Sequence, residues 1–347
     1  MLHGRSFGIF AAAIVAVQVI TALTGTGYFL TQLIMSGWYA LVVIGLCLLM
    51  GYAGQISLGH AAFFAIGGYT TAVLTTMNLL PYKNIAIVKL LSAAGMTLSG
   101  TNSWGSTVLY VSPWLSLLAA VMISAGTAYL IGIPVLRLKG HYLAMATLGF
   151  GTIIYRIVLG TPLFGGADGL SDVPPFGFFA GFALDGNKSH RLAGYYFTMA
   201  AVFAVMMMLV NLINSRAGRA LRAIHGNEGA AQAAGVDTGR YKLHLFVLSA
   251  VIAAVAGVFM THYNGGIGPA EAGVMKSVRY VAIVAVGGMA NLWGALIAGI
   301  ILNFLSLRGY FGSFDDAVFG AVLIFMMLFA PNGIVIKRKT KDQIKKT

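Results

Sequence analysis

The chain has 347 residues, of which 59% are hydrophobic and only 9% are charged, and its mean hydropathy is +0.86. Because an average soluble domain carries about 25% charged residues, this composition excludes a water-exposed globular surface and indicates one membrane domain over 1–347. The net charge of +13 comes from basic residues between apolar runs and at the C-terminal end, a distribution typical of membrane topology signals rather than of a nucleic-acid surface.

The first apolar run covers 7–24, directly after Arg5. This pattern is also typical of a signal peptide, but the run is long and leads straight into the next one, so we interpret it as a retained helix. Further spans of about 20 residues, the length that crosses a bilayer, are predicted near 28–50, 59–78, 113–135, 141–160, 194–214, 243–263 and 314–336. The predicted fold class is an all-α, polytopic transmembrane helix bundle with about 8–10 membrane segments, some of them discontinuous or re-entrant.

A glycine-rich break follows the second span. Its glycines are Gly51, Gly54 and Gly59. Irregular backbone at membrane depth requires protein or a water-filled cavity to satisfy its polar groups, and broken helices indicate a transport path. The polar residues that we expect to line a translocation pathway here are Gln55, Ser57 and His60. A histidine that only hydrogen-bonds a neighbouring helix is the alternative interpretation of His60.

The next connection, 80–112, is long, and we place it on the outer side of the membrane. It is apolar between Ile85 and Leu98, which is compatible with a helix at the outer surface.

The most informative hydrophilic stretch covers 215–242, on the inner side. Ser215 predicts an N-cap, and arginines then recur every three residues along one side of a short helix. Asn227 predicts the cap of a second, alanine-rich helix that Gly235 ends. Such a small-residue surface flanked by charges suits a groove on a partner protein. A basic loop that only maintains topology is the alternative.

The apolar stretch 278–307 has about 30 residues and, at ~1.5 Å per residue, exceeds a ~30 Å hydrocarbon core. Gly287 and Gly288, followed by Asn291, weaken a helix there. We expect the stretch to bend and return, with Asn291 in the pathway. The basic tail 337–347 then lies on the same side as the N-terminus, and the inner side carries fourteen Lys and Arg against seven outside, as the positive-inside rule requires.

The sequence contains no Gly-x-x-x-x-Gly-Lys-Ser/Thr loop. If transport uses ATP, another chain hydrolyses it. None of the nine Asp and Glu residues falls deep within a predicted span, which argues against an ion-coupled carrier. The histidines lack metal-ligand spacing, no Ser-His-Asp group can be assembled, and Cys47 is the only cysteine. We therefore predict no catalytic residue, metal site or cofactor on this chain.

Four blocks resemble the M-type permease subunits of branched-chain amino-acid ABC importers, in the hydrophobic amino acid uptake family. They are GYAGQISLGHAAFFAIGGY at 51–69, LRLKGHYLAMATLGFGTIIYRIV at 136–158, SRAGRALRAIHGNEGAAQAAGV at 215–236 and VAVGGMANLWGALIAG at 284–299. The resemblance implies alternating-access transport of branched-chain or related amino acids across the bacterial inner membrane, with both termini cytoplasmic. The implied partners are a homologous H-type permease subunit, two cytoplasmic ATPase subunits that bind ATP and Mg, and a periplasmic substrate-binding protein.

The resemblance also makes 215–242 the cytoplasmic coupling loop. The coupling residues that it implies are Arg219, Arg222, Glu228, Ala230, Ala231 and Gly235. The family pattern Glu-Ala-Ala-x-x-x-Gly has its glutamate where this chain has Gly229, so Glu228 lies one position early.

Three alternatives remain open from the sequence. One is a secondary carrier or channel that works without an ATPase, and another is a permease of the same importer family for urea, amides or aromatic acids. The third, an intramembrane enzyme or assembly scaffold, lacks a catalytic group or a partner signal.

Overall fold

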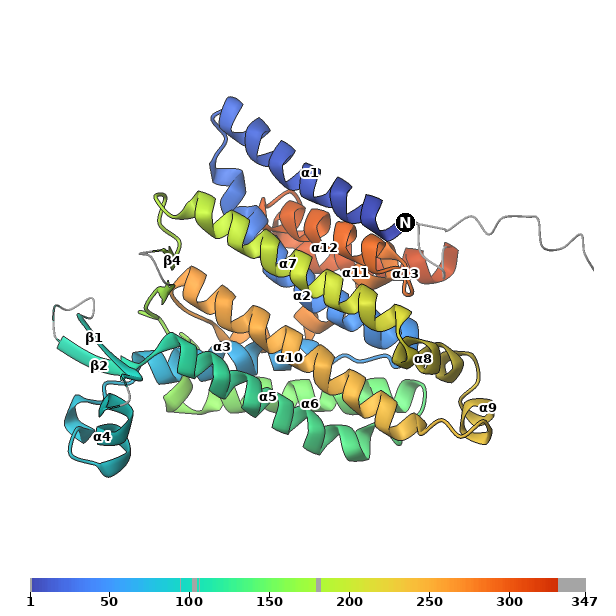
Figure 1. Ribbon diagram of the computed structural model, residues 1–347, viewed down its shortest axis with the longest axis horizontal. Coiled ribbons are helices and arrows are strands. Elements are labelled where there is room, and N and C mark those ends of the chain that lie inside the picture. The colour runs from blue at the N-terminus through green and yellow to red at the C-terminus, as the bar shows by residue number, and fades with distance from the viewer. Residues whose placement is uncertain (1, 94, 102–104, 106, 179–181, 330–347) are drawn as a thin grey trace, which may run out of the picture.

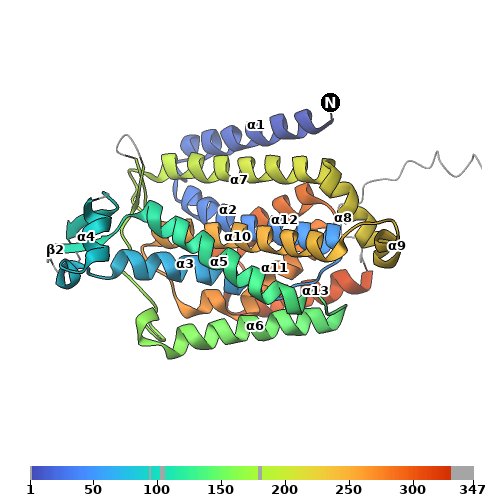
Figure 2. The same ribbon diagram turned by 60° about the horizontal axis from the view of Figure 1, so that its bottom comes forward.

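The computed structural model describes all residues except 1, 94, 102–104, 106, 179–181 and 330–347 (Figure 1). Most helices run along one common direction and form a bundle, which confirms the predicted polytopic helical fold (Figures 1 and 2). The basic tail predicted at 337–347 lies outside the described residues.

Six helices of the described chain are long and apolar enough to cross a membrane. They are α1 (Leu2–Leu23), α2 (Tyr28–Ala53), α5 (Pro113–Val135), α6 (His141–Gly160), α7 (Arg191–Asn214) and α10 (Thr238–Asn264). The shorter helices are α3 (His60–Thr76), α4 (Ala86–Ala93), α8 (Arg216–Gly226), α9 (Glu228–Ala233), α11 (Val274–Gly287), α12 (Leu292–Leu307) and α13 (Asp315–Phe329). The 3₁₀ turns are η1 (Leu80–Tyr82), η2 (Pro162–Phe164), η4 (Pro269–Ala272) and η5 (Gly312–Phe314).

The two ends of the bundle differ. The N-terminus lies at the same end as α8 and α9, and α4 with its neighbouring strands lies at the opposite end (Figures 1 and 2). The segment 80–112 therefore projects from the end opposite the predicted coupling loop. Only part of its apolar stretch is the helix α4. The rest contributes β1 (Thr97–Thr101), which pairs antiparallel with β2 (Thr107–Val111), a hairpin that the sequence analysis did not anticipate.

Both predicted helix breaks are present, and they meet. The stretch 278–307 divides into α11 and α12, of 14 and 16 residues, which at ~1.5 Å per residue are each too short for a ~30 Å core. Gly51, near the C-terminal end of α2, touches the turn between them, because a Cβ at Gly51 would lie 1.6 Å from the Met289 carbonyl oxygen. The Tyr52 hydroxyl also donates to the Ala290 carbonyl at 2.9 Å. Only a glycine lets the two breaks come this close.

Small residues also set the contact between α3 and α10 at the centre of the bundle. A Cβ at Gly257 would lie 2.0 Å from the Phe64 carbonyl oxygen, and one at Gly67 would lie 2.1 Å from that of Ala254. Such close backbone approach is typical of membrane helices, where packing rather than the hydrophobic effect holds neighbours together. This close contact fixes α3, which follows the first break, against α10, which follows the predicted coupling loop.

Candidate coupling loop and translocation pathway

The helix α8 has two distinct sides. The Ser215 hydroxyl accepts from the Gly218 amide at 3.4 Å and caps the helix, as the sequence predicted. Gly218, Leu221 and Ile224 are buried against the bundle, where α8 packs on α2 and α7. The arginines are offset by one position from this buried row and are exposed, so they face away from the bundle. They are Arg216, Arg219 and Arg222.

The helix α9 follows after one residue. The Asn227 side chain accepts from the Ala230 amide at 3.0 Å and caps it, and Gly235 ends the turn with a φ of +83°. Ala230 is exposed, but Ala231 is only 4% exposed. The alanine-rich surface available to a partner therefore includes Ala230 and not Ala231, whose methyl group packs inward.

Glu228 is engaged within the loop. Its carboxylate lies 2.5 Å from the Lys242 ammonium, near the start of α10, and accepts from the Thr238 hydroxyl at 3.3 Å. Partial burial acts to raise the pKa of Glu228, but the hydrogen bond and positive charge of Lys242 outweigh it and lower the pKa below its usual value. The ion pair thus ties α9 to α10. This tie gives Glu228 a structural partner inside the loop.

The loop reaches the first helix break directly. Gly54 ends α2 in the left-handed conformation, with a φ of +65°, and a Cβ there would lie 3.0 Å from the His225 Nδ1 atom at the end of α8. The break, the two loop helices and the α5–α6 connection together line a cavity of about 260 Å³. Gln55 lines this cavity and is 3% exposed, and neither polar atom of its side chain has a partner among the described residues.

The Ser57 and His60 side chains of the first break are hydrogen-bonded, unlike that of Gln55. His60 is fully buried, with its Nδ1 atom 3.1 Å from the Ser57 hydroxyl and its Nε2 atom 2.7 Å from the Ser249 hydroxyl of α10. The Leu58 amide donates to the Thr147 hydroxyl of α6 at 2.9 Å. This is the arrangement that irregular backbone needs inside a membrane. It corresponds to the alternative interpretation of His60, a histidine bound to a neighbouring helix.

Asn291 begins α12 at the second break. Its side-chain oxygen accepts from the Gly294 amide at 3.2 Å, so the residue acts as an N-cap. Gly287 and Gly288 end α11 before it, and a Cβ at Gly287 would lie 2.5 Å from the Ala295 Cα atom. The glycines let α11 and α12 fold back on each other at this turn.

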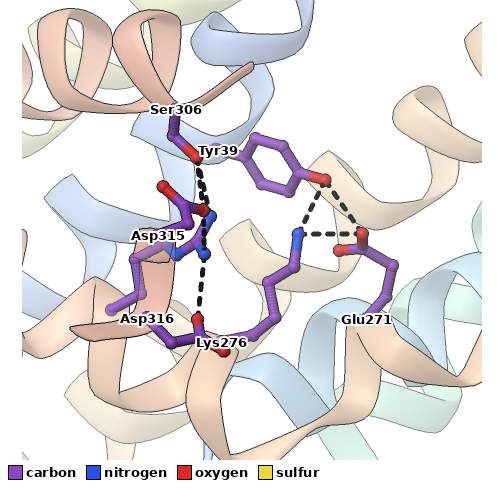
Figure 3. Close-up of polar contacts among 7 residues, drawn as sticks. Tyr39, Glu271, Lys276, Ser306, Asp315 and Asp316 are labelled. Carbon is purple, nitrogen blue, oxygen red and sulfur yellow. Dashed lines mark hydrogen bonds and ion pairs between the residues drawn. The ribbon is translucent and has the colours of Figure 1, made fainter. Parts of the chain in front are cut away.

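A cluster of charged groups that the sequence analysis missed lies beside α2. Glu271, Lys276 and Tyr39 form one group, and Arg279 binds Asp315, Asp316 and Ser306 in another (Figure 3). Glu271 was not placed at membrane depth because it follows a glycine-rich loop, outside any apolar run. The signal that could have found it is Lys276 and Arg279 at three-residue spacing around the start of the apolar stretch 278–307, because charges there need partners.

Comparison with known proteins gives consistent matches. A family model described as the permease component of the branched-chain amino acid transport system matches residues 28–330. The high-affinity branched-chain amino acid transport system permease protein LivM of Escherichia coli K12 is 28% identical over 328 residues, covering 88% of this chain and 69% of LivM. The corresponding permease protein LivH of the same organism is 28% identical over 321 residues, covering 89% of this chain and 96% of LivH. The ribose import permease protein RbsC of Haemophilus influenzae is 31% identical over 123 residues, covering 33% of this chain and 38% of RbsC. No solved structure matches the chain.

Proposed function

Because the chain belongs to the family of branched-chain amino acid transport system permease components, we propose that it is the M-type permease subunit of an ABC importer in the bacterial inner membrane. Its cargo is a branched-chain or related amino acid. Its partners are an H-type permease subunit, a periplasmic substrate-binding protein and two cytoplasmic ATPase subunits. ATP and Mg are bound by the ATPase subunits, since this chain has no phosphate-binding loop.

The observation that carries the proposal is the contact between the loop helices and the break after α2. An ATPase that docks on the exposed arginine side of α8 can push or pull this helix. The opposite side of α8 packs on α2, and the C-terminal end of α8 touches Gly54. Gly51, three residues earlier, touches the turn between α11 and α12. A displacement of α8 is thus passed through packed backbone to both helix breaks, which is the mechanical link that alternating access requires.

The orientation follows from the same arrangement. The coupling loop faces the cytosol, where ATP is available, and the N-terminus lies at the same end of the bundle (Figure 1). The segment 80–112 then faces the periplasm, and the positive-inside rule assigns the basic tail 337–347 to the cytosolic side.

The docking assignment is tested by charge reversal on α8. Arg219→Glu and Arg222→Glu should each reduce co-purification of the ATPase subunits with the membrane-inserted permease, because repulsion replaces attraction at the docked surface. Arg137→Glu is the matched control, since Arg137 is an exposed arginine in the neighbouring α5–α6 connection. Stoichiometric ATPase recovery with both α8 variants would refute docking on this helix.

The pathway proposal comprises Gln55, Ser57, His60 and Asn291. Gln55 is its sharpest test because its side-chain amide lines a cavity and has no partner in the described part of the chain. In a Cys47→Ala background, Gln55→Cys should react with a water-soluble thiol reagent at a rate that changes with nucleotide. Ala61→Cys, fully buried in α3, is the unreactive control. Equal inertness of both cysteines under all conditions would contradict a pathway through Gln55.

A further inference from the structure

Only one of the two oxygens of the Glu271 carboxylate has hydrogen-bond partners among the described residues. Its Oε1 atom accepts from the Lys276 ammonium at 2.9 Å and from the Tyr39 hydroxyl at 3.0 Å, and Lys276 also lies 3.2 Å from that hydroxyl (Figure 3). The Oε2 atom is buried and has no partner among the described residues. A carboxylate can accept hydrogen bonds at both oxygens, so one full acceptor remains available in this cluster.

The cluster lies at membrane depth. Tyr39 is the twelfth residue of the 26-residue helix α2, about 16 Å along the axis from its first residue at ~1.5 Å per residue. Glu271 lies in η4, which follows α10 in the chain, and it reaches this level because η4 packs against α3 and α6. Charged groups at such depth are costly and are typical of substrate or ion pathways.

Two tyrosine hydroxyls extend the polar surface. Tyr280 is fully buried and Tyr69 is 2% exposed, and neither hydroxyl has a hydrogen-bond partner in the described structure. The Tyr280 ring centroid lies 6.3 Å from that of Tyr39, and Tyr69 belongs to the same buried cluster as Ala272, the residue after Glu271. By contrast, the neighbouring Arg279 is bound by two carboxylates and fastens α13 to α11. Buried polar atoms without a partner among the described residues occur in both groups: Arg279 Nε and Asp315 Oδ1 in one, and Glu271 Oε2 with the Tyr69 and Tyr280 hydroxyls in the other. The Glu271 group differs because its three unpartnered atoms are all oxygens that can accept a hydrogen bond from an ammonium group.

We propose that Glu271 binds the ammonium group of the amino acid in transit, while Lys276 turns from Glu271 to the substrate carboxylate. This inference rests on the proposed function and names the residues that recognise the cargo. The resting pair of Glu271 and Lys276 carries no net charge, and neither does a zwitterionic amino acid. Exchange of partners between the two pairs therefore makes two ion pairs without burying net charge, which avoids the large cost of an unpaired ion in a low-dielectric site.

The test uses the complete importer in vesicles with its binding protein, and it records ATP-driven uptake of L-leucine and ATP hydrolysis in the same preparation. Glu271→Gln should lower leucine uptake per ATP by about tenfold or more, the usual effect of losing a hydrogen bond to a charged group. Stimulation of hydrolysis by the loaded binding protein should persist, because the coupling loop is unchanged. Glu271→Asp, which keeps the carboxylate, should recover part of the uptake.

A second variant separates recognition from a purely structural ion pair. Glu271→Gln combined with Lys276→Met leaves no unpaired charge, so its thermal stability should match or exceed that of Glu271→Gln alone. Uptake per ATP should nevertheless stay low. Asp316→Asn is the matched control, since it removes a 58% exposed carboxylate from the neighbouring Arg279 group, and it should transport normally.

Wild-type uptake per ATP by Glu271→Gln, or recovery of uptake in the double variant, would overturn the assignment. A wild-type importer that hydrolyses ATP but takes up no branched-chain or related amino acid would instead overturn the proposed function.

Discussion

Replacing Gly51 by alanine tests whether the two helix breaks move as one unit. The new Cβ would lie 1.6 Å from the Met289 carbonyl oxygen and 2.8 Å from the Ala290 Cα atom, and real Cβ atoms essentially never come within 3.0 Å of such neighbours. Both contacts are backbone atoms, so no side chain can rotate away. The turn between α11 and α12 must therefore move away from α2.

The expected cost can be estimated from two effects. Overpacking of a tight interior contact typically costs ~1–3 kcal/mol. Separation of the breaks also strains or removes the hydrogen bond from Tyr52 to the Ala290 carbonyl, which contributes ~0.5–1.5 kcal/mol. We expect a total destabilisation of about 2–4 kcal/mol, together with weaker coupling of ATP hydrolysis to uptake, because the second break no longer follows the first.

The measurement is the thermal unfolding temperature of the purified permease complex, together with uptake per ATP in vesicles. Gly126→Ala is the matched control: Gly126 lies in the exposed middle of α5 with nothing within 4 Å of a new Cβ, and alanine favours a helix over glycine by ~1 kcal/mol. If Gly51→Ala matches Gly126→Ala in both quantities, the two breaks do not interlock and the proposed mechanical link is wrong.

Three further predictions concern the loop and the bundle. Because the folded pKa of Glu228 is lowered, its tie to Lys242 stabilises α9 above the unfolded pKa and is lost as pH falls through the folded pKa. The protection factors of the α9 amides, taken relative to the intrinsic exchange rate at each pH, should therefore fall on acidification, and Lys242→Met should abolish that pH dependence. Ala231→Leu should loosen α9 in the same exchange measurement, since Ala231 is buried. Ala230→Leu changes an exposed residue, so it should leave α9 ordered and reduce ATPase co-purification. Equal exchange in the two variants would contradict the assignment of Ala231 to packing and Ala230 to docking. Gly257→Ala should lower the unfolding temperature, because its Cβ would lie 2.0 Å from a backbone oxygen of α3; an unchanged temperature would show that α3 and α10 tolerate separation.

The sequence by itself determined the features that depend on local periodicity and local chemistry. Long apolar runs must be helices in lipid because every backbone group needs an internal partner, and the described residues include six such helices. The caps at Ser215 and Asn227, the end at Gly235 and the break before Asn291 were likewise readable, since each is set by residues within one helical turn.

Only the tertiary structure decided which of these local features meet. The contact of Gly51 with Met289 joins residues more than 200 positions apart, and nothing in either segment specifies the other. Glu271 lies in a loop by its own sequence and reaches Tyr39 only because η4 packs between α3 and α6. Likewise, Glu228 is paired and Ala231 is buried because the start of α10 and the bundle lie against α9. Long-range packing determines the partner of a polar or small residue, and the local pattern determines only the helix that carries it.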